Sequence, residues 1–297
     1  MQLSSSECIN WFAVILTVCA AIATVNLISI ILFIKNRSLR TRAMNLVISL
    51  TIADMFVGGF SFFDSIRVYN TYGCDIVKMN LSQELVAIIS FLYLWFPLTS
   101  LTNIAAISLD RMHATIRPFA HRLIKKWVYG VTIAGVWVLA AMVNAMFFII
   151  TLRYRQYLIY GFYFWHSYCC LCLFVICVSY SSIVVKFLCG AHPQHHGAAN
   201  RQRKLTVTLF IMTIVSLLMW LPYAVFIFLV YQPSKKKILS FQELERSELS
   251  LIILYLMNSL VNPIVYTIRM PEFRKALLVL FKRQRRQNDP DIPLHAL

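Results

Sequence analysis

The 297-residue chain is 59% hydrophobic and only 13% charged, and its mean hydropathy of +0.69 is too high for an ordinary soluble domain. The formal net charge of +16 does not indicate a nucleic-acid partner, because Lys and Arg stand in short clusters between apolar runs instead of along one continuous face. The composition therefore indicates an integral membrane protein.

Seven apolar runs are long enough to cross a hydrocarbon core, which takes about 20 helical residues. Barrel strands are excluded, because a tilted strand would use only about 9–11 alternating residues. We expect an all-α membrane protein, with a seven-transmembrane helix bundle over residues 11–269 after an extracellular amino terminus over residues 1–10. The runs cover residues 11–34, 43–63, 85–109, 127–151, 157–185, 205–231 and 249–268.

The basic residues set the expected orientation. With the amino terminus outside, 20 of the 28 Lys and Arg residues lie on the cytoplasmic side, as the positive-inside rule favours. The exception is the last outer loop, where residues 235–237 are lysines and three glutamates follow. We expect a multi-pass protein of the plasma membrane with its amino terminus outside. In this orientation Asn80, in Asn80-Leu81-Ser82, is an outer-loop glycosylation acceptor.

Two runs contain residues that are costly in hydrocarbon. Pro263 removes a helix hydrogen bond from the seventh run, at about 3 kcal/mol in a helix interior, and Asn258 and Asn262 bring amides into the same segment. Asp54 lies in the middle of the second run, where a carboxylate costs about 2.5–3.5 kcal/mol on insertion scales. Asp54 should face the bundle interior and either bind a cation or be protonated. The alternative is a buried, satisfied carboxyl with no switching role.

Motifs in six of the runs occur in a fixed order. Each is weak alone, and a single asparagine such as Asn26 would equally suit an ordinary contact between helices. Together they make the chain similar to rhodopsin-like (class A) G-protein-coupled receptors. The motifs are Asn26, Leu50-Thr51-Ile52-Ala53-Asp54, Asp110-Arg111-Met112, Trp137, Met219-Trp220-Leu221-Pro222 and Asn262-Pro263-Ile264-Val265-Tyr266.

The resemblance implies a receptor, and not an enzyme, that passes an extracellular ligand signal to a heterotrimeric G protein by outward movement of the sixth helix. It also implies a water-filled site that can hold an allosteric sodium ion in the resting state. The residues at the matching positions are Asp54, Ser100, Asn258, Ser259 and Asn262.

A G-protein switch is the second site that the resemblance implies. Arg111 is held by Asp110 at rest and extends on activation toward Tyr180 and Tyr266. The resemblance also implies two kinks. Trp220 is the toggle residue at the floor of the pocket, and Pro222 bends the sixth helix so that its inner end can swing outward; Asn262 and Pro263 bend the seventh.

The chain departs from the family pattern in the relay between pocket and switch. Gln202 stands where many relatives have an acid that pairs with the third-helix arginine, so we expect a weaker resting lock and elevated basal signalling. Cys172 replaces the usual fifth-helix proline and Ser216 the usual sixth-helix phenylalanine, which predicts an altered packing relay.

The common disulfide of the family cannot form, because Val86 occupies the position of the third-helix cysteine. The absence of this cysteine and of the fifth-helix proline is similar to the melanocortin, cannabinoid and lysophospholipid receptor group. Four cysteines lie near the oxidising outer face and can form a substitute bridge, namely Cys8, Cys74, Cys169 and Cys170. The sequence does not determine which two of them pair.

The expected ligand pocket is mostly apolar and aromatic. Retinal is excluded because Leu256 stands where a lysine would form the Schiff base, and a biogenic amine is disfavoured because Tyr93 replaces the third-span acid. We expect Asp64 to receive a cationic group of the ligand; the alternative is a boundary carboxylate paired with Arg67. By resemblance the pocket is lined by Asp64, Tyr93, Phe96, Pro97, Phe164, Tyr168, Trp220, Tyr223, Ile252 and Tyr255.

After the seventh run, residues 270–283 are expected to form a short amphipathic helix at the inner surface. Phe273, Leu277, Leu278 and Phe281 recur at helical spacing, and the basic residues between them can meet anionic headgroups of membrane lipid. Residues 284–297 form a short cytoplasmic tail without Ser or Thr, so we expect no phosphorylation of it.

An ion-coupled transporter or channel is the alternative from another class, because an intramembrane Asp54 and a broken seventh helix also suit an ion path. The absence of an internal repeat and the position of Arg111 beside basic inner loops disfavour it. A membrane hydrolase is disfavoured because neither HExxH nor GxSxG occurs. Nucleotide exchange on G proteins that depends on Arg111 would favour the receptor, and ion flux without exchange would favour the transporter.

Overall fold

The computed structural model describes residues 5–39, 44–71, 82–153, 158–189, 197–230 and 241–288. Every regular element in these ranges is helical, which confirms the predicted all-α class. The long helices are α1 (Ser5–Lys35), α2 (Met44–Thr71), α3 (Gln83–Ile116), α5 (Lys126–Arg153), α6 (Leu158–Cys189), α7 (Gly197–Val230), α8 (Phe241–Arg269) and α9 (Pro271–Asn288), and the short ones are η1 (Arg37–Leu39) and α4 (Pro118–Arg122).

The seven predicted runs coincide with seven of these helices. Within the described residues, α1, α2, α3, α5, α6 and α8 are long and apolar enough to cross a membrane. The helix at the sixth run, α7, contains a shorter apolar stretch, Thr213–Phe226. Most helices continue beyond their apolar run into polar residues, because the backbone hydrogen bonds of a helix do not end where the hydrocarbon ends.

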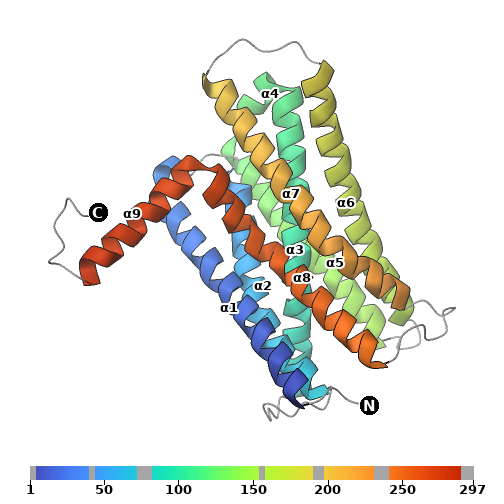
Figure 1. The fold of residues 1–297 in the computed structure, drawn as a ribbon. Coiled ribbons are helices and arrows are strands. Elements are labelled where there is room, and N and C mark those ends of the chain that lie inside the picture. The colour runs from blue at the N-terminus through green and yellow to red at the C-terminus, as the bar shows by residue number, and fades with distance from the viewer. Residues whose placement is uncertain are drawn as a thin grey trace.

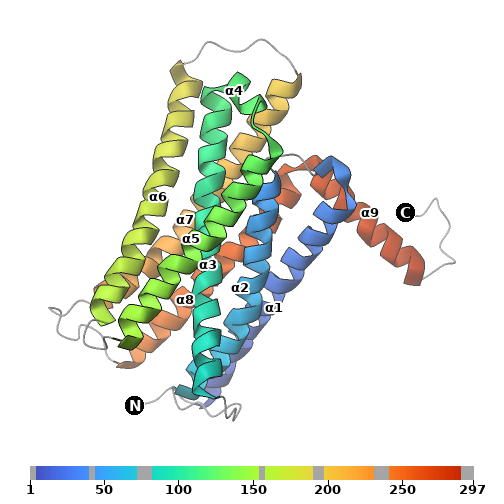
Figure 2. The same cartoon turned by 180° about the vertical axis from the view of Figure 1, so that it is seen from behind.

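The central helix of the bundle is α3, which contacts α2, α5, α6 and α7. At one edge α1 packs against α2 and α8. Both views show α3 passing through the middle, with the start of α1 at one end of the bundle and α4 at the other (Figures 1 and 2). We call these the amino-terminal end and the α4 end.

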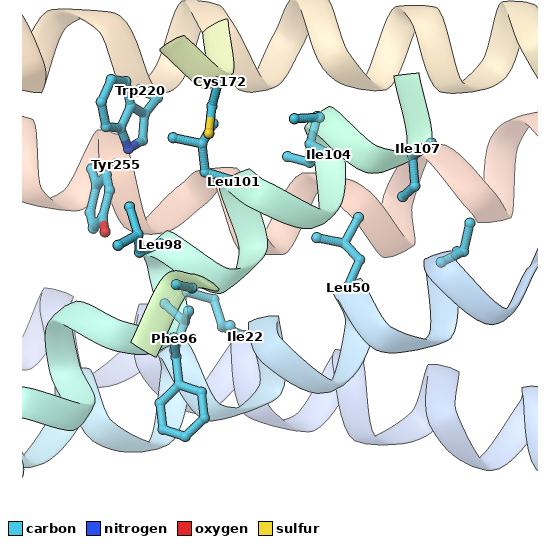
Figure 3. Close-up of a cluster of buried hydrophobic side chains, with 14 of the residues drawn as sticks. Ile22, Leu50, Phe96, Leu98, Leu101, Ile104, Ile107, Cys172, Trp220 and Tyr255 are labelled. Carbon is cyan, nitrogen blue, oxygen red and sulfur yellow. The ribbon is translucent and has the colours of Figure 1, made fainter. Parts of the chain in front are cut away.

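A line of apolar side chains on α3 forms the middle of the core. Leu98, Leu101, Ile104 and Ile107 follow one another at intervals of three residues and are all buried. Figure 3 shows this line between α2, which contributes Leu50, and the helices on the other side. In lipid such contacts stabilise the fold through packing, because hydrocarbon tails are as apolar as the side chains themselves.

The backbones of α1 and α2 approach each other closely at Gly58. A Cβ atom added there would lie 2.7 Å from the carbonyl oxygen of Cys19 and 2.8 Å from the backbone nitrogen of Ala23. Small residues at helix contacts in membranes permit this close packing. Gly58 therefore fixes the position of α2, which carries Asp54.

The cysteines clarify one open prediction. Cys8 forms a disulfide bond, whereas Cys169 and Cys170 have free thiols. Cys74, the remaining candidate for the substitute bridge, lies outside the described residues. Cys8 therefore takes part in a bridge, and the two cysteines of α6 do not.

The amphipathic segment after the seventh run is the helix α9, which turns away from α8 at the α4 end of the bundle (Figure 1). Its first turn is anchored by Phe273, which is fully buried against Phe33 and Tyr266, with ring centroids 5.5 and 5.9 Å away. Leu278 is exposed, so the apolar face that we predicted for a membrane surface is only partly covered by the bundle.

Candidate functional site

Asp54 is completely buried, and three side chains from two other helices donate hydrogen bonds to it. The hydroxyls of Ser100 and Ser259 donate to Oδ1 at 2.7 and 2.8 Å, and the amide of Asn262 donates to Oδ2 at 2.6 Å. Asn26 joins the cluster from α1, because its amide donates to the backbone oxygen of Ser259 at 3.0 Å. The structure thus brings together residues of α1, α2, α3 and α8 that the sequence places far apart.

The donor set of this cluster fits a monovalent cation. The side-chain oxygens of Asn26, Asn258 and Asn262 are buried and have no hydrogen-bond partner among the described residues. Hard cations prefer such amide and carboxylate oxygens, and the single carboxylate of Asp54 balances one positive charge. Within the ranges that the structure describes, no group of three or more His, Cys, Asp or Glu side chains could hold a metal ion.

A second polar cluster surrounds Asp110 at the α4 end. The Nε of Arg111 donates to Asp110 Oδ2 at 3.0 Å, and its Nη2 contacts the same oxygen. The other carboxylate oxygen accepts from the hydroxyl of Tyr129 on α5 at 3.0 Å and lies 3.0 Å from Nε2 of His121 on α4. Arg111 is thus held in the arrangement that we expect of the resting state.

The two tyrosines of the predicted switch form their hydrogen bonds and ring contacts with residues other than Arg111. Tyr180 is buried on α6 and accepts a hydrogen bond of 3.1 Å from Thr213 of α7. Tyr266 is buried on α8, and its ring packs against Phe33 of α1 at 6.2 Å and against the first turn of α9. Each tyrosine therefore joins neighbouring helices, and Tyr180 also interacts electrostatically with Arg111.

The helix α7 places Trp220 in the core, within its apolar stretch Thr213–Phe226. Pro222 lies inside α7, as Pro263 lies inside α8 and Pro97 inside α3. The ring of Trp220 is buried and stacks on Trp165 of α6 with centroids 6.4 Å apart. A shift of α6 against α7 would disturb this contact directly.

Aromatic residues gather between Trp220 and the amino-terminal end of the bundle, where we predicted the ligand pocket. Tyr223 of α7 and Tyr255 of α8 face each other at 5.2 Å, and the hydroxyl of Tyr168 on α6 lies 3.0 Å from that of Thr102 on α3. Phe96 is buried and stacks on Phe56, Phe60 and Trp95. Ile252 is half-buried beside this core, and Pro97 is buried next to Phe96.

Asp64 belongs to the same region. It is buried on α2, and both Asp64 and Glu248 of α8 interact electrostatically with the hydroxyl of Tyr93 on α3. Phe164, in contrast, has 39% of its surface exposed and lies on the outer side of α6. Asn80 and the side chain of Arg67 lie outside the described residues, so the glycosylation site and the alternative pairing of Asp64 stay predictions.

The relay positions lie on α6 and α7. Cys172 is buried in the core (Figure 3), and Ser216 is buried with no hydrogen-bond partner for its hydroxyl among the described residues. The side chain of Gln202 lies outside the described part of α7, so its effect on the resting lock stays a prediction.

Sequence reasoning missed four residues of these clusters. His121 and Tyr129 hold Asp110, Trp165 stacks on Trp220, and Phe119 of α4 is 81% exposed beside the Asp110 cluster. The signal for α4 was Pro118, since proline is favoured in the first turn of a helix. Tyr129 and Trp165 depend on which way a long helix faces, and an evenly apolar helix does not reveal this.

Comparisons with known proteins bear on the whole bundle. The model of the family "7 transmembrane receptor (rhodopsin family)" matches residues 25–266, which is more than half of the chain. The fold is similar to that in a crystal structure of squid rhodopsin, with a TM-score of 0.69 and 19% sequence identity over 99% of this chain and 94% of that one. At this identity the structural likeness supports the fold alone. A search of curated proteins finds no match.

Proposed function

The chain belongs to the rhodopsin family of seven-transmembrane receptors, and we propose that it signals to a heterotrimeric G protein by outward movement of α7, its sixth span. Membership confirms the predicted receptor class and disfavours the transporter or channel, and it agrees with a multi-pass membrane protein that is not an enzyme. The amino-terminal end of the bundle is outside in this proposal, and the α4 end faces the cytoplasm, as the basic residues favour.

The arrangement around Asp110 carries this proposal. A buried guanidinium group is held by one carboxylate, and that carboxylate is held in turn by side chains of α4 and α5. Next to it, Phe119 and Leu123 present large apolar side chains that are 81% and 82% exposed. Contiguous exposed apolar groups mark protein-interaction sites, and in this proposal Phe119 and Leu123 form part of a docking surface for the G protein beside the restrained charge of Arg111.

The helix α7 is suited to move at this end. It packs mainly against α8 and only lightly against α3 and α6, and Pro222 interrupts its hydrogen bonding. A kink of this kind lets the two halves of a helix move separately. Outward movement would break the bond between Thr213 and Tyr180, and Arg111 would then turn from Asp110 toward the freed tyrosine.

The cluster around Asp54 would hold a sodium ion through Asp54, Ser100, Asn258, Ser259 and Asn262. When bound, the ion would neutralise a carboxylate that is otherwise expensive to bury. These hydrogen bonds link α2, which carries Asp54, to α3 and to the segment of α8 around Pro263. Ser100 of α3 donates one of them, and Ser259 and Asn262 of α8 donate the other two.

The ligand would bind among the aromatic residues at the amino-terminal end, above Trp220. Two acids, Asp64 and Glu248, act on the hydroxyl of Tyr93 there, which favours a ligand with a cationic group. Most of the remaining surface is aromatic, so the rest of the ligand would be apolar.

Expression of the chain in cells, followed by measurement of nucleotide exchange on G proteins, tests the proposal without a known ligand. We expect basal exchange from the unaltered chain and its loss in Arg111→Ala, while Glu84→Ala, at an exposed residue in the first turn of α3 at the opposite end of the bundle, serves as a surface control. Ion flux that is unaffected by Arg111→Ala, without exchange, would overturn the proposal in favour of the transporter.

A further inference from the structure

A groove of about 640 Å³ opens on the lipid-facing side of the bundle, where α6 passes the end of α3. Its wall includes Ile116, the last residue of α3, and a series of α6 residues from Phe174 to Lys186. The volume lies within the range of about 300–1,000 Å³ that is usual for small-molecule sites. The groove is separate from the ligand region, the Asp54 cluster and the Asp110 cluster.

The α6 wall of the groove is a single helical stripe. Phe174, Cys177, Val178, Ser181, Ser182 and Val185 follow one another at alternating intervals of three and one, which places them on one face. Twelve residues separate Phe174 from Lys186, or about 18 Å at the rise of an α-helix. This is slightly more than half of a hydrocarbon core of about 30 Å, so the groove extends from the middle of the membrane to one surface.

The stripe faces the membrane and not the core. Phe174 is 66% exposed and Val185 is 57% exposed, whereas Ile176, Tyr180 and Ile183 on the opposite face of α6 are buried. A surface of this kind within a membrane span contacts lipid tails. The apolar half of the groove therefore suits an acyl chain.

The end of the groove near Lys186 is positively charged. Lys186 lies there with an exposed side chain, and Arg117, which is also exposed, directly follows Ile116. The sequence of α6 contains neither Asp nor Glu. The hydroxyl of Ser182 is used in a bond to the carbonyl oxygen of Val178, while the exposed Ser181 adds a polar group just before the headgroup level. Lysines and arginines at this depth attract the anionic lipids of the cytoplasmic leaflet.

We propose that this groove binds one anionic glycerophospholipid of the cytoplasmic leaflet. An acyl chain would lie along Phe174, Val178 and Ile116, and the phosphate would lie beside Lys186 with Arg117 at the same level. The choice of leaflet rests on the proposed orientation of the receptor, but binding itself requires neither a ligand nor a G protein.

Photo-crosslinking in a reconstituted membrane tests the site. The full chain is incorporated into phosphatidylcholine vesicles that contain a trace of phosphatidylglycerol or phosphatidylcholine, each with the same photoactivatable group in an acyl chain. Crosslinked peptides are then identified by mass spectrometry. We expect the phosphatidylglycerol probe to label residues 174–185 about fivefold more than the phosphatidylcholine probe, the difference that one lysine gives near an anionic headgroup. Around Val138 and Met142, which are exposed in the middle of α5 between its basic ends at Lys126 and Arg153, both probes should label equally.

The variant Lys186→Gln should reduce the preference at residues 174–185 to nearly equal labelling, and Lys126→Gln on α5 should leave it unchanged. Both lysines are exposed, so neither change should affect folding. Equal labelling by the two probes in the unaltered chain would contradict the proposal, as would a preference that survives Lys186→Gln. Crosslinks between two receptor chains through the stripe would also overturn it, because a second copy would then cover the groove. Since no G protein is present, none of these results depends on the signalling proposal.

Discussion

Loss of the Tyr129 hydroxyl should raise basal signalling. This hydroxyl donates to Asp110 Oδ1 at 3.0 Å, and Tyr129 is buried, so Tyr129→Phe removes one hydrogen bond to a carboxylate without changing the size of the ring. Hydrogen bonds to charged groups contribute about 1.5–3 kcal/mol. The low end applies here, because His121 and Arg111 continue to satisfy the carboxylate.

If this bond exists only in the resting state, its loss shifts the equilibrium toward the active state by about tenfold, which corresponds to about 1.4 kcal/mol. Nucleotide exchange on a purified G protein, measured with reconstituted receptor and no ligand, should rise accordingly. Tyr160→Phe is the matched control, because Tyr160 is exposed on α6 far from Asp110. Basal exchange in Tyr129→Phe equal to that of the control would refute the assignment of Tyr129 to the resting lock.

Three further predictions follow from other parts of the bundle. Sodium at ten times its dissociation constant should stabilise the unaltered receptor by about 1.4 kcal/mol against thermal unfolding, and Asp54→Asn should remove this difference when sodium is compared with an organic cation; an undiminished difference would exclude Asp54 as the ligand. Gly58→Ala should lower stability by about 1–3 kcal/mol, because a Cβ would lie 2.7 Å from the Cys19 carbonyl oxygen, whereas Gly135→Ala, with open space around it, should not; equal melting temperatures would contradict the packing argument. Asp64→Asn should abolish responses to cationic agonists while surface expression holds, and unchanged potency would discard Asp64 as the receiving group.

The sequence was sufficient to predict those features that depend on the membrane. Hydrophobic length identified seven spans, because a helix that crosses the core must satisfy its own backbone and bury about 20 apolar residues. The cost of a carboxylate in hydrocarbon likewise predicted that Asp54 would face inward and find partners, and the structure shows Ser100, Ser259 and Asn262 as these partners.

Features that depend on helix rotation could not be predicted in this way. The α6 sequence is apolar on all sides, so its pattern did not indicate that Trp165 faces the core and Phe164 faces outward. The five residues of α4 are too few for a periodic signal, so His121 was missed as a partner of Asp110. Tyr129 was missed because the sequence of α5 does not show which of its faces turns toward Asp110. Tyr266 was predicted as a switch residue from the family resemblance alone, whereas the structure shows the contacts that it makes with Phe33 and Phe273.

The central claim is that the α4 end of the bundle activates a G protein through Arg111 and an exposed docking surface. Nucleotide exchange by purified receptor in lipid vesicles, measured with G proteins of several classes, tests this claim most directly. The account predicts ligand-free exchange above that of empty vesicles with at least one class, lost in Arg111→Ala and strongly reduced in Phe119→Ala. Exchange that is the same in the unaltered chain and in both variants would contradict it.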